Sequence, residues 1–281
     1  RDSSTSRGLG DVYKRQVNIK AENVGRKAAM DVSGGGKTKV ELDGQNVLDS
    51  YSVLYQAGLR KQGEGTLTIT DETDDRGNKI TATKSGTSGS LTAKGAGGNG
   101  AAGIGGSVAE GTKNITIEGY ATVHAAGGGS GAGIGGGGIY GDTQSGDAEN
   151  IIIQGHSKVT ASAGAGAAIG GGSASVGLGD YRQGGSAKGI VICGHATVVA
   201  KAGVGAAIGA AGYSGNSTEA VVIIGTPGAT ADKENVHVTA IGGTGSAIGN
   251  GAKDTKVTIQ GRSTIKTASS QNYAAIGSGY G

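Results

Sequence analysis

The sequence is poor in the residues that fill an ordinary globular core. Its 281 residues include one Pro, one Met, no Trp and no Phe, and hydrophobic residues make up only 35%. So little bulky apolar volume argues against a wide core and leaves room for a narrow one. With a single cysteine, Cys193, the chain can form neither an internal disulfide framework nor a cysteine-based zinc site.

Long apolar runs and an excess of one charge are also missing. No run of about 18 apolar residues occurs and no secretory signal peptide is visible, so we expect no membrane insertion in this segment. The formal net charge is +3, and it falls to +1 without residues 1–16. Because nucleic-acid-binding proteins need a concentrated basic face, this balance predicts no nucleic acid partner.

The first sixteen residues stand apart from the rest. They read RDSSTSRGLGDVYKRQ, have no counterpart later in the chain, and do not begin with Met. We interpret residues 1–16 as non-native read-through of adapter or vector sequence, and we expect them to be disordered. Residues 17–281 are expected to form a single domain that is truncated relative to the natural protein.

Glycine is abundant, with 61 residues, and it belongs to a repeat. Two small residues followed by Ile-Gly occur six times, and two degenerate copies precede them. The third residues of the eight copies are Met30, Leu59, Ile104, Ile134, Ile169, Ile208, Ile248 and Ile276. Eight units of unequal length indicate a constant frame with variable insertions.

Each complete unit contains two further strand-like segments. A β-branched run closed by Gly comes first, at 115–119, 151–155, 190–194, 221–225 and 257–261. A second run follows at 122–125, 158–161, 197–200, 237–240 and 264–267. Three short strands per unit, joined by glycine corners, predict an all-β fold, a right-handed parallel β-helix of about eight coils with variable loops.

The connections after each Ile-Gly are where the units differ most. They run from 7 residues after Gly249 to 19 residues after Gly170, and insertions in solenoids tend to share one face. Tyrosine rings can stack on sugars, and nearby polar groups can bind sugar hydroxyls. The candidate carbohydrate-binding residues are therefore Tyr140, Asp142, Tyr181, Arg182, Tyr213 and Tyr280. The alternative is that these tyrosines fold back and cover the coil wall.

Strand alternation also predicts an apolar strip on the outer surface. If residues 115/117, 151/153, 190/192, 221/223 and 257/259 face inward, then Ile152, Val191, Val222 and Ile224 face outward. Such a strip is unusual on a free monomer. We expect the longest loops to pack over it, and a partner surface is the alternative.

Several short motifs have a chemical interpretation as well as a structural one. Residues 131–136 match GxGxxG, but no helix-forming segment follows and the sibling copies lack the pattern. His156 and His195 follow the strand-closing Gly in adjacent units, which predicts a stacked surface pair near Cys193 more than a metal pair. The acids Asp71, Glu72, Asp74 and Asp75 share one loop, which suggests a solvated turn more than a cation site. No catalytic residue, cofactor or metal site is expected.

The repeated AAGIGG, GAGIGGG, GAAIGGG and GAAIGAAG, alternating with NITIEG and NIIIQG, resemble bacterial cell-surface β-helix proteins classed as carbohydrate-binding and common in gut Firmicutes. The similarity covers about residues 17 to 281. It implies an extracellular, non-catalytic module on the bacterial surface that contacts polysaccharide or host glycan, joined to other domains of a longer surface protein. Two alternatives remain open, a structural spacer of a larger adhesin and a polysaccharide lyase or hydrolase.

Overall fold

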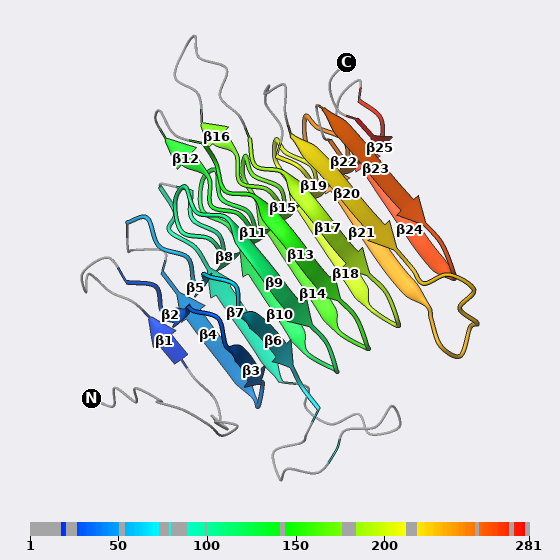
Figure 1. Ribbon diagram of the computed structural model, residues 1–281, viewed down its shortest axis with the longest axis horizontal. Coiled ribbons are helices and arrows are strands. Elements are labelled where there is room, and N and C mark those ends of the chain that lie inside the picture. Colours follow the sequence, from blue (N-terminus) through cyan, green and yellow to red (C-terminus); the bar gives the residue numbers. More distant parts are fainter. Residues whose placement is uncertain are drawn as a thin grey trace.

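All regular structure in the described residues is β-strand. The computed structural model describes residues 18–20, 27–50, 54–72, 79, 89–98, 100–140, 144–175, 184–211, 218–250, 253–269 and 273–278. Within these ranges the strands form three large parallel sheets and one two-stranded sheet (Figure 1). No helix in them is long and apolar enough to cross a membrane.

The Ile-Gly segments form the second of the three large sheets, which we call sheet 2. Its eight short strands are β2 (Met30–Val32), β5 (Leu59–Lys61), β8 (Ile104–Gly105), β11 (Ile134–Gly135), β15 (Ile169–Gly170), β19 (Ile208–Gly209), β22 (Ile248–Gly249) and β25 (Ile276–Gly277). The register pairs each of the eight repeat residues with the next, from Met30 to Ile276. All eight repeat units identified in the sequence are therefore coils of one solenoid.

The second strand-like runs form sheet 1. It contains β1 (Asn18–Lys20), β4 (Gln45–Asp49), β7 (Ser90–Lys94), β10 (Thr122–Ala126), β14 (Lys158–Ala163), β18 (Thr197–Ala202), β21 (Val236–Gly242) and β24 (Ser263–Ser269). The runs closed by Gly form sheet 3. It contains β3 (Lys37–Glu41), β6 (Thr66–Thr70), β9 (Thr112–Ile117), β13 (Ala148–Ile153), β17 (Ala187–Ile192), β20 (Glu219–Ile224) and β23 (Asp254–Ile259).

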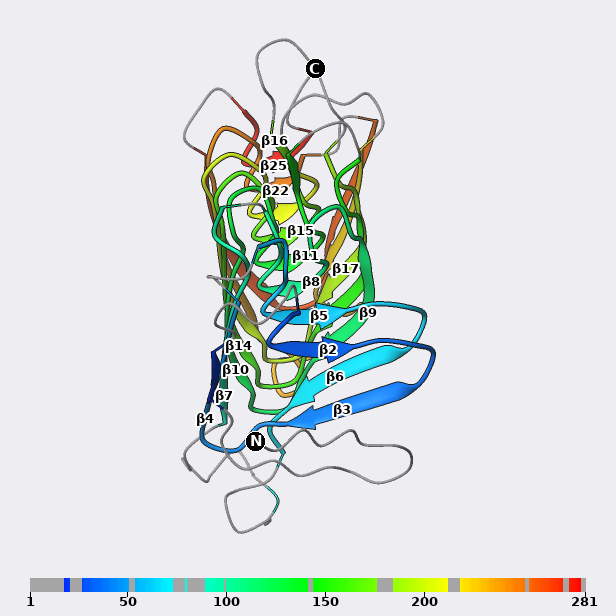
Figure 2. The ribbon, with the colours of Figure 1, turned by 90° about the vertical axis from the view of Figure 1, so that its left-hand side faces the viewer.

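The chain visits sheets 3, 1 and 2 in turn, so each circuit is one coil. Figure 2 shows sheet 1 on one side, sheet 3 on the other and the short strands of sheet 2 between them. Parallel strands in sequential order identify the fold as a right-handed parallel β-helix, as the repeat predicts.

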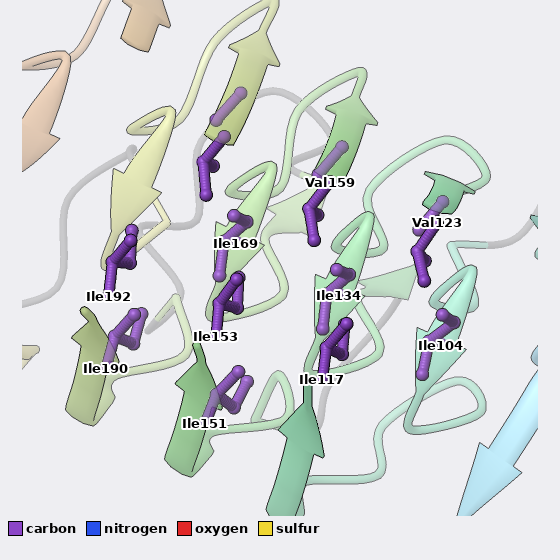
Figure 3. Packing of buried hydrophobic residues seen from close by; sticks show 14 of the residues in the cluster. Ile104, Ile117, Val123, Ile134, Ile151, Ile153, Val159, Ile169, Ile190 and Ile192 are labelled. Atoms are coloured by element: carbon purple, nitrogen blue, oxygen red, sulfur yellow. The ribbon is translucent and has the colours of Figure 1, made fainter. Parts of the chain in front are cut away.

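The core is a set of one-residue columns running along the solenoid. Ile117, Ile153 and Ile192 lie one above another on sheet 3, and Ile104, Ile134 and Ile169 do so on sheet 2 (Figure 3). All six are fully buried. In the last coil the corresponding Ile259 and Ile276 are 48% and 37% exposed, because no coil of the described residues lies beyond them.

One strand contradicts the predicted alternation. In β20, Val222 and Ile224 are fully buried, whereas Val221 and Ile223 are only half-buried, the reverse of the expectation. In β9, β13 and β17 an unpaired residue with positive φ (Asn114, Asn150, Gly189) separates the first inward residue from the next. Strand β20 lacks this bulge residue, so Lys188 pairs with Val221 and Ile190 with Val222.

The closing glycine of β20 is displaced as well. The Gly225 amide donates to the Ile192 carbonyl at 2.7 Å, the bond that Cys193 makes to Ile153 one coil earlier. Alignment on the closing glycine therefore shifts this strand by one position. The half-buried outer strip is Ile152, Val191 and Ile223, and the middle parts of the loops expected to cover it lie outside the described residues.

The first coils contain strands that the repeat did not indicate. Strands β3, β4 and β7 have no recognisable copy of the later motifs, yet β3 pairs in register with β6, β4 with β7 and β7 with β10. A small additional sheet joins β12 (Ile139–Tyr140) to β16 (Ala174–Ser175). Residues 1–16, interpreted above as read-through, lie outside the described residues.

Candidate functional site

The variable connections start and end along one row at the junction of sheets 2 and 3. Gly146, at the end of one connection, donates its amide to Gly137 at the start of the same connection at 2.7 Å. Gly185 makes the same bond to Gly172 one coil further on, also at 2.7 Å. The Gly172 amide in turn donates to Gly146 at 3.0 Å, which joins the two coils.

This row, which we call the loop-base row, continues to the next coil through the bond from the Ala211 amide to Gly185. Glycine is required at two of its positions because a Cβ at Gly172 or Gly185 would overlap the backbone of Gly137 or Gly146 one coil earlier. Successive connections therefore leave the solenoid about 4.8 Å apart, the spacing of neighbouring strands. Side chains from neighbouring connections can contact one ligand from such a row.

The predicted carbohydrate-binding residues all belong to these connections. Tyr140 is the last residue of β12, and its backbone pairs with Ser175 of β16. Its side chain lies outside the described part of the structure, as do Asp142, Tyr181, Arg182, Tyr213 and Tyr280. Their assignment as ligand contacts therefore stays a prediction.

A three-membered ring stack stands at the opposite end of the sheet 3 strands, where the chain turns into sheet 1. Tyr120 stacks on His156 with ring centroids 4.9 Å apart, and His156 stacks on His195 at 4.6 Å. The stacking of the two histidines predicted from the repeat is confirmed. Both faces of the His156 ring are covered by its two neighbours, so this ring offers no stacking platform to a sugar.

The same geometry disfavours a metal ion between the histidines. The two imidazole planes differ by 1° and nitrogen lone pairs lie in the ring planes, so the lone pairs of His156 and His195 lie in two parallel planes and do not converge on one ion. Burial and the charge of His195 lower the pKa of His156. Within the described ranges, no three His, Cys, Asp or Glu side chains gather where they could hold a metal ion.

Cys193 lies two residues before His195 and is half-buried. Its Sγ donates to Gln154 Oε1 at 3.9 Å. Burial, together with the negative charge of Glu234, raises the pKa of the Cys193 thiol above its usual range. A reactive or metal-binding cysteine needs the thiolate, so this environment favours an unreactive thiol.

Three charged side chains, Asp31, Arg60 and Glu110, connect the first three coils on the outside of sheet 2. Arg60 Nε donates to Glu110 Oε2 at 2.8 Å and its Nη2 donates to Glu110 Oε1 at 2.6 Å. Arg60 Nη1 donates to Asp31 Oδ2 at 2.8 Å. Burial raises the pKa of Glu110, but the hydrogen bond and charge of Arg60 outweigh it, so that the pKa lies below its usual value. Each carboxylate is paired with the guanidinium, which indicates a structural role.

Asp71, one of the acids considered for cation binding, is buried instead of solvated. It is 1% exposed, its Oδ2 accepts the Gly89 amide at 2.6 Å, and its Oδ1 has no hydrogen-bond partner. Burial, with smaller contributions from the charges of Glu41 and Asp43, raises the pKa of Asp71 to about 6. The expectation of a solvated turn is therefore wrong for Asp71, while Asp74 and Asp75 lie outside the described residues.

This carboxyl group predicts a pH dependence of stability. Because the pKa is higher in the folded protein than in the unfolded chain, Asp71 favours folding below about pH 4, and this contribution is lost as the pH rises through about 6. The loss is on the order of 3 kcal/mol. The Asp71→Asn variant keeps an acceptor for the Gly89 amide and carries no charge. Urea unfolding of both proteins between about pH 4 and about pH 8 should show the wild type losing stability relative to the variant, and a constant difference would contradict the assignment.

Comparison of the chain with family models, with curated protein sequences and with solved structures found no match.

Proposed function

We propose that the protein is a non-catalytic, cell-surface carbohydrate-binding or adhesive β-helix, and that its tyrosine-bearing connections contact polysaccharide. The loop-base row is the observation that supports this proposal most directly. It sets the ends of successive connections side by side. In the sequence, Tyr140, Tyr181 and Tyr213 belong to three successive connections. Connections that leave the solenoid at such intervals suit an extended sugar chain better than a compact small molecule.

Replacement of the three tyrosines tests this proposal. The variant Tyr140→Ala, Tyr181→Ala, Tyr213→Ala should lose at least about tenfold in affinity for whichever glycan the wild type binds on a glycan array. Tyr120→Ala is the matched control, because its ring lies in the stack with His156 and outside the loop-base row. An unchanged affinity in the triple variant would sink the assignment of the tyrosines.

Two other results would point to the alternative functions. If the folded wild type binds no glycan on the array, a structural spacer in a larger adhesin becomes the better interpretation. If it cleaves a polysaccharide with turnover, the non-catalytic assignment is wrong. Reducing-sugar release from acidic and neutral polysaccharides, with and without added calcium, measures this directly.

A further inference from the structure

The outer face of sheet 1 carries charge of one sign only on its last six strands. Its last six strands, β7, β10, β14, β18, β21 and β24, contain no Asp and no Glu. Each of the six contains one basic side chain that is exposed. In order, they are Lys94, His124, Lys158, Lys201, His237 and Lys266. We call this surface the basic face.

The alternation within each strand confirms that these side chains point outward. In β14, Val159 and Ala161 are buried, whereas Lys158, Thr160 and Ser162 are exposed. In β18, Val198 and Ala200 are buried and Lys201 is exposed. The basic groups therefore stand on the solvent side of a sheet whose other side is the core.

The register spreads these charges across the face. Lys158 pairs with Thr197, and Lys201 pairs with Ser162 on one side and Ile241 on the other. None of the six basic residues has another of them as a direct cross-strand partner. Like charges that face each other on neighbouring strands repel, and this arrangement avoids that cost while extending the positive surface in both directions.

Sheet 3 shows the opposite pattern, with mixed charges that neutralise one another. Lys188 is 3.2 Å from Asp147, and Lys253 is 3.7 Å from Glu219. On the basic face, Lys94 is 3.8 Å from Asp49 of β4. Among the described residues, no carboxylate lies within 4.0 Å of the other three lysines, Lys158, Lys201 and Lys266. Their field is therefore available to an external anion.

We propose that the basic face binds an acidic polysaccharide, an extended chain with repeated carboxylate groups that lies across the strands. The six strands span about 24 Å along the solenoid axis and offer one cationic or protonatable group about every 4.8 Å. Hydroxyl groups of Thr92, Thr160 and Thr239 share the central column and can bind sugar hydroxyls. This surface lies on a different wall from the loop-base row, so the proposal stands without the tyrosine contacts.

The chemistry of the face favours a polysaccharide over a nucleic acid. Recognition of nucleic acid phosphates favours the bidentate guanidinium of Arg over Lys, and single-stranded bases stack on aromatic rings. The six strands contain no Arg and no Tyr. Lysines interspersed with Thr and Ser match a ligand whose charges are separated by hydroxyl groups.

Two variants with equal loss of charge test the proposal. The first replaces the four lysines of the basic face, Lys94→Gln, Lys158→Gln, Lys201→Gln and Lys266→Gln. The second is the matched control on the wall of sheet 3, Lys113→Gln, Lys188→Gln, Lys253→Gln and Lys256→Gln. The probe is polygalacturonate, which carries one carboxylate per sugar, with fully methyl-esterified polygalacturonate as the uncharged form of the same backbone.

The full chain should bind polygalacturonate, and the affinity should fall steeply when NaCl is raised from about 20 mM to about 300 mM. The basic-face variant should lose at least about tenfold in affinity at low salt. Each exposed ion pair contributes little by itself, and the affinity comes from several of them together. The control variant should change by less than about twofold. Circular dichroism checks that both variants retain the fold, and Lys158→Glu with Lys201→Glu gives a second variant with only two changes.

Three outcomes would overturn the proposal. Equal losses in both fourfold variants would mean that net charge, and not this face, governs binding. Equal binding of the esterified polymer would exclude recognition of the carboxylates. Tighter binding of single-stranded DNA than of polygalacturonate, abolished in the basic-face variant, would identify a nucleic acid surface instead. The triple tyrosine variant should bind polygalacturonate like the wild type, so this proposal and the proposed glycan site can fail separately.

Discussion

Gly170→Ala should destabilise the protein by more than about 4 kcal/mol and prevent correct stacking of the sixth coil on the fifth. Gly170 has a φ of +142°, a conformation that residues with a Cβ rarely adopt. A Cβ on Gly170 would also overlap the carbonyl oxygen of Gly209, the residue above it in sheet 2. That oxygen belongs to the backbone of the next coil, so no side-chain rotation can relieve the overlap. Chemical unfolding followed by circular dichroism measures the effect.

Two control substitutions separate the causes. Gly228 has a φ of +66°, and no atom lies within 4 Å of the place its Cβ would take, so Gly228→Ala should cost only about 1–2 kcal/mol of backbone strain. Gly98 has open space around it and no positive φ, so Gly98→Ala should change stability by less than about 0.5 kcal/mol. If Gly170→Ala were no worse than Gly228→Ala, the close contact between coils would not be what requires glycine in the Ile-Gly column.

The stacked coils were predictable from the sequence because equivalent positions in every coil have the same packing requirements. Ile104, Ile134 and Ile169 occupy one column. A Cβ on the glycine after each would overlap the carbonyl oxygen of the equivalent glycine in the next coil. Identical environments select identical residues, so the sequence repeats wherever the geometry repeats. For this reason all eight units could be recognised in the sequence, including the two degenerate copies at Met30 and Leu59, which pair in register.

Local departures from the repeat were not predictable from alternation alone. The bulge residues Asn114 and Asn150 look like ordinary strand residues in the sequence, yet both have positive φ and Asn150 donates to Asn114 across the coils at 2.8 Å. In β20 the closing Gly225 occupies the position that Cys193 has in β17, one residue before the closing glycine, and this shift inverts the two faces relative to the repeat. The burial of Asp71 was missed for a similar reason, because an acid in a turn is usually solvated.

The two candidate sites, the tyrosine-bearing connections and the basic face, differ in how clearly the sequence indicates them. The tyrosine-bearing connections could be located because they interrupt the repeat, whereas nothing in the repeat predicts their conformations. The basic face left a signal in the sequence, since each second strand from Ser90 to Ser269 holds one Lys or His and no acid. The overall net charge is near zero and does not indicate this basic face, because the acids that balance these lysines lie on other parts of the chain.

The register of β20 leads to the second large effect. Ile224→Asp should abolish folding or cost more than about 4 kcal/mol, because Ile224 is fully buried in the core column between Ile192 and Ile259. Ile223→Asp should cost less than about 1 kcal/mol, since Ile223 faces outward and is half-buried. Simple alternation from the closing Gly225 predicts the reverse order.

The preceding strand supplies the matched pair, because alternation and structure agree there. Ile192 is fully buried and Val191 is half-buried, so Ile192→Asp should be severe and Val191→Asp mild. Urea unfolding of all four variants compares the two strands directly. A severe Ile223→Asp with a mild Ile224→Asp would mean that β20 is aligned on its closing Gly225 like the other strands of sheet 3, and the outer strip would then contain Val222 and Ile224. The expected order requires instead that one residue missing before Gly225 inverts the two faces of β20 while β17 and β23 keep theirs.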